Sequence, residues 1–126
     1  MDINVAISQK PPVLLDLKAS IEQAVNTIEE VASQGSQLLV FPEAFLPGYP
    51  TWIWRLKPGG DMALGNQLHT QLRNNAVNIT NGDLEPICEA AARHNLVVVM
   101  GMHEIDSEFS GSTLFNTVVV IDTDGT

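Results

Sequence analysis

The central part of the sequence contains the run Leu38-Leu39-Val40-Phe41-Pro42-Glu43, in which four apolar residues precede a proline and a carboxylate. Such an apolar run predicts a short strand that is covered on both faces. Upstream, Asp16 can cap a helix, and Gly35 stands where a left-handed residue would end it. One apolar stripe runs along this helix, formed by Leu17, Ile21, Ala24, Val25, Ile28, Val31 and Ala32. With an alternating strand at Ile3–Ser8, the order strand–helix–strand predicts a βαβ unit and therefore a parallel sheet.

The sequence after this unit alternates between a long loop and further regular elements. Residues Pro42–Gly60 are rich in proline, glycine and aromatic side chains, which predicts a long functional loop. Helical spacing predicts two helices, at about 64–76 and 83–94. Apolar runs at Leu96–Gly101 and Leu114–Ile121 predict two more strands.

The last residues, Asp122-Thr123-Asp124-Gly125, form a hairpin-turn sequence. A hairpin turn requires a returning strand, so we expect residues 1–126 to be the N-terminal portion of a single, truncated domain. The strand before the turn would then present an unpaired edge. We therefore expect the chain to self-associate or to pair with the missing C-terminal portion.

Composition narrows the class of protein. Hydrophobic residues make up 44% of the 126 residues and charged residues 17%, which is typical of a folded chain. The net charge is −9 and the six basic residues are scattered, which argues against nucleic acid and anionic membranes as partners. The N-terminus carries no pattern of a secretory signal. A single cysteine suits a reducing compartment, so a cytoplasmic protein is expected.

Glu43 is the strongest candidate for a catalytic residue. It follows a buried parallel strand, and the carboxyl ends of such strands are where ligands bind in α/β sheets. We expect its carboxylate to be partly desolvated, as suits a general base. The alternative is a solvated glutamate at a strand end, or a helix-capping partner.

The longer string Gly35-Ser-Gln-Leu-Leu-Val-Phe-Pro-Glu43-Ala-Phe-Leu-Pro-Gly-Tyr-Pro50 resembles the first signature of the nitrilase family. Similarity to the family continues in Ala6–Gln9, Trp52–Trp54, Val97–Gly101 and Leu114–Thr117. The resemblance covers essentially the whole chain, but only the N-terminal part of the family's domain.

This resemblance implies an α/β fold, the N-terminal part of a four-layer α-β-β-α sandwich, and a Glu–Lys–Cys catalytic set that acts on a small-molecule nitrile. The cysteine thiolate would form a thioimidate, with glutamate as general base and lysine stabilising the tetrahedral species. Only Glu43 matches this set. Cys88 lies on the apolar stripe of a predicted helix, which favours a core residue over a nucleophile. An aliphatic amidase or cyanide hydratase fragment, and a non-catalytic α/β binding module, are the alternatives.

Other chemistry-bearing residues carry weaker predictions. Tyr49 and Trp52 could line the entrance for an apolar or aryl nitrile, or they could be loop-packing or interface aromatics. His103 and Glu104 are expected to follow the strand Leu96–Gly101 and so to point toward the site. They make a poor metal site, and we expect no metal or cofactor.

Overall fold

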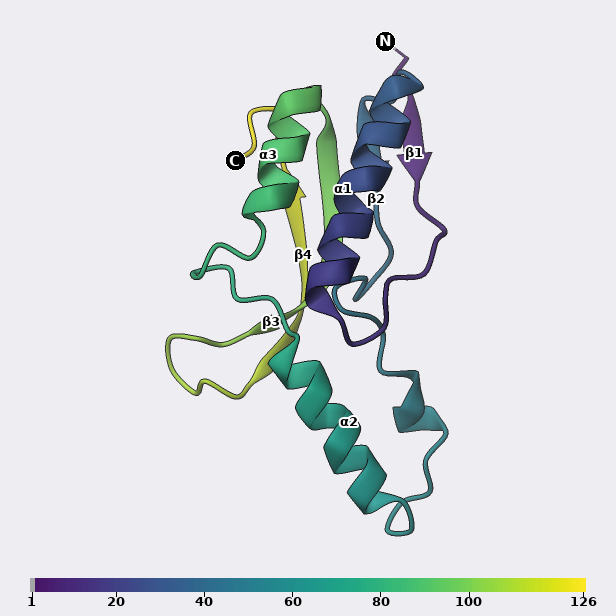
Figure 1. Ribbon diagram of the computed structural model, residues 1–126, viewed down its shortest axis with the longest axis vertical. Helices are drawn as coiled ribbons and strands as arrows, with labels where there is room; N and C mark the ends of the chain where they lie inside the picture. The colour runs from purple at the N-terminus through teal and green to yellow at the C-terminus, as the bar shows by residue number, and fades with distance from the viewer. Residues whose placement is uncertain (1) are drawn as a thin grey trace.

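The computed structural model describes residues 2–126, which form one four-stranded sheet with three α-helices (Figure 1). The elements in chain order are β1 (Val5–Ile7), α1 (Leu17–Ser33), β2 (Leu38–Val40), the 3₁₀ helix η1 (Thr51–Trp54), α2 (Met62–Asn74), α3 (Glu85–His94), β3 (Val97–Ile105) and β4 (Leu114–Ile121). None of the helices formed by these residues has the length and apolar content needed to cross a membrane.

The sheet has the strand order β1-β2-β3-β4, with parallel pairing up to β3 and an antiparallel β4 at the edge. The parallel strands share a register in which Ala6, Leu39 and Val98 lie side by side. The predicted βαβ unit is therefore confirmed as β1–α1–β2. Strand β3 is longer than predicted, because its second half pairs with β4 through Ile105.

Helix α1 begins and ends where the sequence predicts. The Asp16 carboxylate accepts a hydrogen bond from the Ala19 backbone N–H at 3.0 Å, which satisfies an otherwise unpaired donor at the helix start. Gly35 follows the helix with a φ of +83°, a conformation that glycine adopts at little cost. These two ends set the length of the connection that brings β2 alongside β1.

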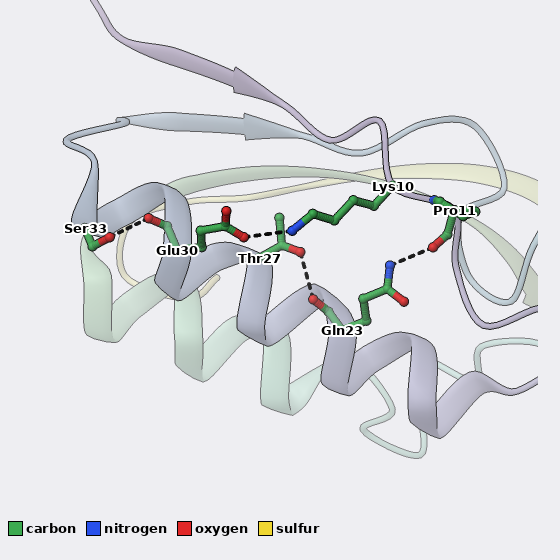
Figure 2. A network of polar contacts seen from close by, with 6 residues as sticks. All are labelled: Lys10, Pro11, Gln23, Thr27, Glu30 and Ser33. Carbon is green, nitrogen blue, oxygen red and sulfur yellow. Dashed lines mark hydrogen bonds and ion pairs between the residues drawn. The ribbon is translucent and has the colours of Figure 1, made fainter.

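Hydrogen bonds join the loop between β1 and α1 to that helix, on the side of the helix that faces β1 (Figure 2). The Lys10 ammonium lies 2.8 Å from a carboxylate oxygen of Glu30, and the Gln23 side-chain amide donates to the Pro11 carbonyl at 2.6 Å. Both ion-pair partners are well exposed, so this pair contributes little to stability. Its effect is to set the path of the loop.

Helices α1 and α3 pack side by side on one face of the sheet (Figure 1). Alternate strand residues point into the layer between sheet and helices, because side chains in a strand alternate between its faces. The fully buried side chains include Ala24, Ile28, Leu39, Ile87, Ala90, Ala91, Val98 and Met100. Burying each of the larger side chains among them, the isoleucines, leucine, valine and methionine, stabilises the fold by about 1.5–3 kcal/mol. This layer is the hydrophobic core of the chain.

The opposite face of the sheet, the uncovered face, is largely apolar, and no helix or strand of residues 2–126 packs on it. Val5 and Ile7 are exposed there, as are Val118 and Val120, which have exposed fractions of 62% and 65%. The expectation that the strands are covered on both faces is therefore wrong for the described chain. The apolar run that suggested it is real, but only the helix-facing side is buried.

The isolated chain is expected to self-associate through this uncovered face, which exposes apolar side chains, and through the free edge of β4, which offers unpaired backbone N–H and C=O groups to another strand. Light scattering at tens of micromolar should report a mass well above that of the monomer. Val118→Lys combined with Val120→Lys should restore monomers, whereas Phe109→Lys, which removes one isolated exposed side chain in a loop, should not. A sharp monomer for the unmodified chain would contradict the prediction.

Candidate active site

Glu43 lies at the carboxyl end of β2, in a short segment that continues along β3. The Phe41 N–H donates to the Val99 carbonyl at 2.8 Å, and the chain then turns through Ala44, whose φ is +50°. Further on, the Leu46 N–H donates to the Gly101 carbonyl at 3.2 Å. Residues 41–46 therefore form an arch beside β3. The arch is hydrogen-bonded to Val99 at its start and to Gly101 at its end, and the chain turns between these two bonds.

Two buried aromatic residues support this arch from below. The Phe41 and Phe45 side chains are at most 4% exposed, and their ring centroids lie 4.8 Å apart in a tilted arrangement. Tilted aromatic pairs of this kind add about 0.5–1.5 kcal/mol to the stabilisation from burial. Phe41, Glu43 and Phe45 would share a face in a regular strand, so it is the turn at Glu43–Ala44 that buries the two phenylalanines and leaves Glu43 exposed.

Gly101 lets the arch approach the sheet. A Cβ at this position would lie 2.9 Å from Glu43 Cα and 3.0 Å from Ala44 N, and it would also collide with the Pro42 carbonyl oxygen. The backbone of Glu43 therefore rests directly on β3, on the uncovered face. The sequence pattern predicts Gly101 only as the end of a strand, although a glycine inside a strand is a recognised sign of close backbone approach.

The carboxylate of Glu43 reaches across to β4. Its Oε1 accepts a hydrogen bond from Asn116 Nδ2 at 2.6 Å, between residues 73 positions apart. Glu43 is exposed, so the partial desolvation expected of it is not found in the described chain. Asn116 was noted in the sequence only as part of a family-like string, and its contact with Glu43 was missed.

His103 lies in the same neighbourhood. It belongs to β3 rather than following the strand, and it pairs with Asn116 on β4, so both side chains are on the uncovered face. Its Nε2 is buried without a hydrogen-bond partner among residues 2–126. Burial lowers the pKa of His103 below its usual value, and the nearby Glu43 carboxylate partly opposes this shift.

Glu104 does not join this group, contrary to the expectation. It lies on β3 next to His103 and therefore points to the opposite, helix-side face of the sheet. There its Oε2 accepts a hydrogen bond from the Thr117 hydroxyl at 2.8 Å. The sequence prediction failed here because it ended the strand at Gly101 and treated both residues as loop.

Glu43→Gln is expected to lower the pKa of His103 further, because it removes the negative charge that favours the imidazolium. The midpoint can be followed by NMR of the His103 ring protons as pH is varied. His69 and His94, which lie on α2 and α3, provide internal controls whose midpoints should stay in place. An unchanged or higher midpoint for His103 would show that Glu43 does not act on it.

The aromatic residues of the loop lie at separate places and are not grouped around Glu43. Tyr49 is exposed, three residues after the end of the arch, and Trp52 is half-buried in η1. Trp52 lines a cavity of about 300 Å³ together with residues of α2, including His69. Helix α2 and η1 extend away from the sheet, so this cavity belongs to the projecting part of the molecule (Figure 1).

Cys88 lies on α3, half-buried against the core. Burial raises the pKa of its thiol, and the negative charge of Glu85 raises it further, although a backbone hydrogen bond acts in the opposite direction. Burial is the largest of these effects, and the raised pKa disfavours the reactive thiolate. The location on a core-packed helix agrees with the prediction that Cys88 is not a nucleophile.

A thiol reagent is therefore expected to label Cys88 slowly near neutral pH and rapidly once denaturant is added. The rate of labelling can be measured with a chromogenic disulfide, using the same chain in denaturant as the reference. Rapid labelling of the folded chain, with a midpoint well below about 8.5, would identify a reactive thiolate instead.

Comparisons with known proteins place this geometry in a family. The family model of carbon-nitrogen hydrolases matches residues 4–126. An arylacetonitrilase of Aspergillus niger is 39% identical over 98% of this chain and 34% of its own length. An aliphatic nitrilase of Rhodococcus rhodochrous is 36% identical over 96% of this chain and 31% of its own length. The chain thus spans about a third of the curated relatives that it matches.

Solved structures agree on the fold. An amidase from Nesterenkonia sp. superposes on this chain with a TM-score of 0.59 and 18% sequence identity. The aligned region covers 98% of this chain and 39% of the amidase chain. The NitFhit protein of C. elegans superposes on this chain with a TM-score of 0.65 and 22% sequence identity. The aligned region covers 97% of this chain and 25% of the NitFhit chain. The α/β fold is therefore that of part of a nitrilase-superfamily domain. The match of residues 4–126 confirms the resemblance found in the sequence: the chain belongs to the carbon-nitrogen hydrolase family.

Proposed function

We propose that this chain supplies Glu43 as the general base of a nitrilase-type hydrolase, which converts a nitrile into a carboxylic acid and ammonia. The observation that carries the proposal is the Glu43 carboxylate itself. It stands at the carboxyl end of parallel strands, on the uncovered face, with one oxygen held by Asn116 and the residue still exposed. The sequence around it is the motif by which the chain resembles the nitrilase family.

In the proposed reaction Glu43 takes the proton of a cysteine thiol, and the thiolate then attacks the nitrile carbon. The resulting thioimidate is hydrolysed by water, which releases ammonia and leaves an acyl-enzyme for a second water to cleave. A lysine would stabilise the tetrahedral species. Cys88 is the single cysteine of the chain and lies on α3, on the other side of the sheet from Glu43. The nucleophile would therefore come from outside these 126 residues, and we propose the same for the lysine, because only Glu43 matches the catalytic set of the family.

The uncovered face indicates where those groups would arrive. Gly101 holds the Glu43 backbone against this face, and the exposed Val118 lies opposite Gly101 on β4. A C-terminal portion that buried the exposed valines would bring its own side chains up to Glu43. It would also remove water from around the carboxylate, a condition that strengthens interactions at an active site. We therefore propose such a portion as the partner of this chain.

We further propose that Tyr49 and Trp52 line the entrance for the substrate. Tyr49 lies three residues after the end of the Glu43 arch, and Trp52 borders the cavity of about 300 Å³ beside α2. Aromatic side chains of this kind suit an apolar or aryl nitrile. A nitrile is preferred to an amide as substrate, because the relatives named nitrilases are 36–39% identical to this chain, whereas the amidase similarity is one of fold. We also propose a cytoplasmic location, which the single cysteine supports.

The test is a complementation assay. The chain is mixed or co-expressed with the C-terminal portion of a related nitrilase, and ammonia release is measured from one aryl and one aliphatic nitrile. We expect no detectable turnover by the 126 residues alone, because the parts of a catalytic set act as a unit. Turnover should appear once the two pieces co-purify. Turnover by the chain alone, or none in a demonstrated complex, would contradict the proposal.

A further inference from the structure

We infer that Asn116 is a positioning residue for Glu43: its side-chain amide holds Oε1 and thereby presents Oε2 to the proton that Glu43 removes. This inference rests on the proposed role of Glu43 as general base. Its physical basis is the 2.6 Å hydrogen bond from Asn116 Nδ2 to Glu43 Oε1. A bond of this length to a carboxylate is charge-assisted and stronger than a bond between neutral groups.

The orientation of the Asn116 amide follows from its partner. An ionised carboxylate can only accept hydrogen bonds, so the nitrogen of the amide, and not its oxygen, must face Glu43. Asparagine cannot ionise, so it holds the carboxylate without donating a proton to it or competing for the one being transferred. Only Oε1 has this partner. The two oxygens of Glu43 are thus distinguished, and a general base needs one oxygen aimed at the group that it deprotonates.

The backbone fixes both ends of the contact. Asn116 is in the middle of the β3–β4 ladder, opposite His103, and Gly101 is opposite Val118 in the same register. The Glu43 backbone rests on Gly101. The register and the close approach at Gly101 therefore bring Asn116 and Glu43 within hydrogen-bond distance of each other. A one-residue slip of β4 would turn Asn116 to the opposite face and abolish the contact.

The nearby His103 gives a physical reason for a neutral amide, rather than a charged side chain, at position 116. Its imidazole lies on the same face, and its buried Nε2 has no partner among the described residues, so the ring is best accommodated without charge. Glu43 and His103 are the titratable groups that this contact brings together on the uncovered face. Asn116 gives the Glu43 carboxylate a donor that does not change with pH. Thr117, the next residue on β4, serves the helix-side face instead, where it donates to Glu104.

The experiment uses the assembled enzyme described above and measures kcat and KM across a range of pH. Asn116→Asp keeps the shape, removes the donor and adds a like charge; we expect kcat to fall about 10–100-fold with KM nearly unchanged. The acidic limb of the pH–rate profile should move to higher pH, because the new carboxylate disfavours the charged form of its neighbour. Asn116→Gln, which retains the amide donor, should recover part of the rate. Thr117→Val removes a hydrogen bond of similar length on the other face and should leave the profile in place.

A second measurement does not depend on turnover. In the 126-residue chain, the side-chain amide resonances of Asn116 should shift as acid protonates Glu43, and the shift should be lost in Glu43→Ala. The amide of Asn26, on α1, is the reference. Asn116 resonances that ignore Glu43, or an Asn116→Asp enzyme with normal kcat and pH profile beside an inactive Glu43→Gln enzyme, would overturn the inference and leave the proposed function intact. A normal rate for Glu43→Gln would overturn both.

Discussion

Glu43→Gln is expected to lower ammonia release by the assembled enzyme at least about 100-fold, the lower end of what a positioned general base contributes. Glutamine keeps the size of the side chain, and its amide oxygen can still accept the hydrogen bond from Asn116. The change therefore removes the base while leaving the arch and its contact with β4 in place. Steady-state kinetics with a saturating nitrile provide the measurement, and the loss should appear in kcat rather than in KM.

The matched control for this variant is Glu104→Gln. Glu104 is a second carboxylate on the neighbouring strand that accepts a hydrogen bond from β4, but it does so on the helix-side face. Its replacement should change the rate by no more than about twofold, since surface substitutions away from a site have small effects. Equal losses from both variants would mean that negative charge in general, rather than Glu43 as a base, supports the reaction.

Gly101→Ala is expected to damage both the fold and the site. The added Cβ would need to lie 2.9 Å from Glu43 Cα, and backbone cannot yield as a flexible side chain can. Overpacking of this kind typically costs about 1–3 kcal/mol of folding free energy. The arch must lift away from β3, and a displacement of about 1 Å at a catalytic group can cost 100-fold in rate. Denaturant unfolding of the chain and turnover of the assembled enzyme measure the two effects separately.

Gly65→Ala is the control for the chemistry of the substitution. Gly65 is inside α2, where a Cβ would make an ordinary contact with Leu56 Cδ1 at 3.7 Å. Alanine favours a helix over glycine by about 0.5–1 kcal/mol, so this variant should be as stable as the parent or more so. A Gly101→Ala chain that unfolds at the same denaturant concentration as the parent would contradict the proposed close approach.

The parts of the fold that could be predicted from sequence are those fixed by neighbouring residues. Asp16 and Gly35 mark the ends of α1 through local hydrogen bonding and φ, and the apolar stripe between them requires only the helical period. Glu43 was predicted as a candidate base from a motif that is likewise contiguous, and its catalytic role stays a prediction. These features depend on sequence separations of a few residues, over which propensity and periodicity are informative.

The features that were missed depend on pairing between distant segments. The contact of Asn116 with Glu43 spans 73 residues and follows from the register of β3 and β4, which no local pattern specifies. The length of β3 depends on that same partner strand. The exposure of the valines on one face is invisible in the sequence, because an apolar run reads the same whether one side of a strand is covered or both.

The one-sided burial of the sheet has a consequence for synthesis on the ribosome. All of the helix-side core is in the polypeptide once Ile121 has been added, so this layer can fold before any later residues emerge. The nascent chain then holds a folded unit whose other surface is still exposed to solvent and prone to non-specific association. The exposed apolar side chains on this surface are Val5, Ile7, Val118 and Val120. Chaperones that bind exposed apolar strands would engage it at this stage. Under the proposed function, assembly of the catalytic centre would follow the folding of the layer that carries Glu43.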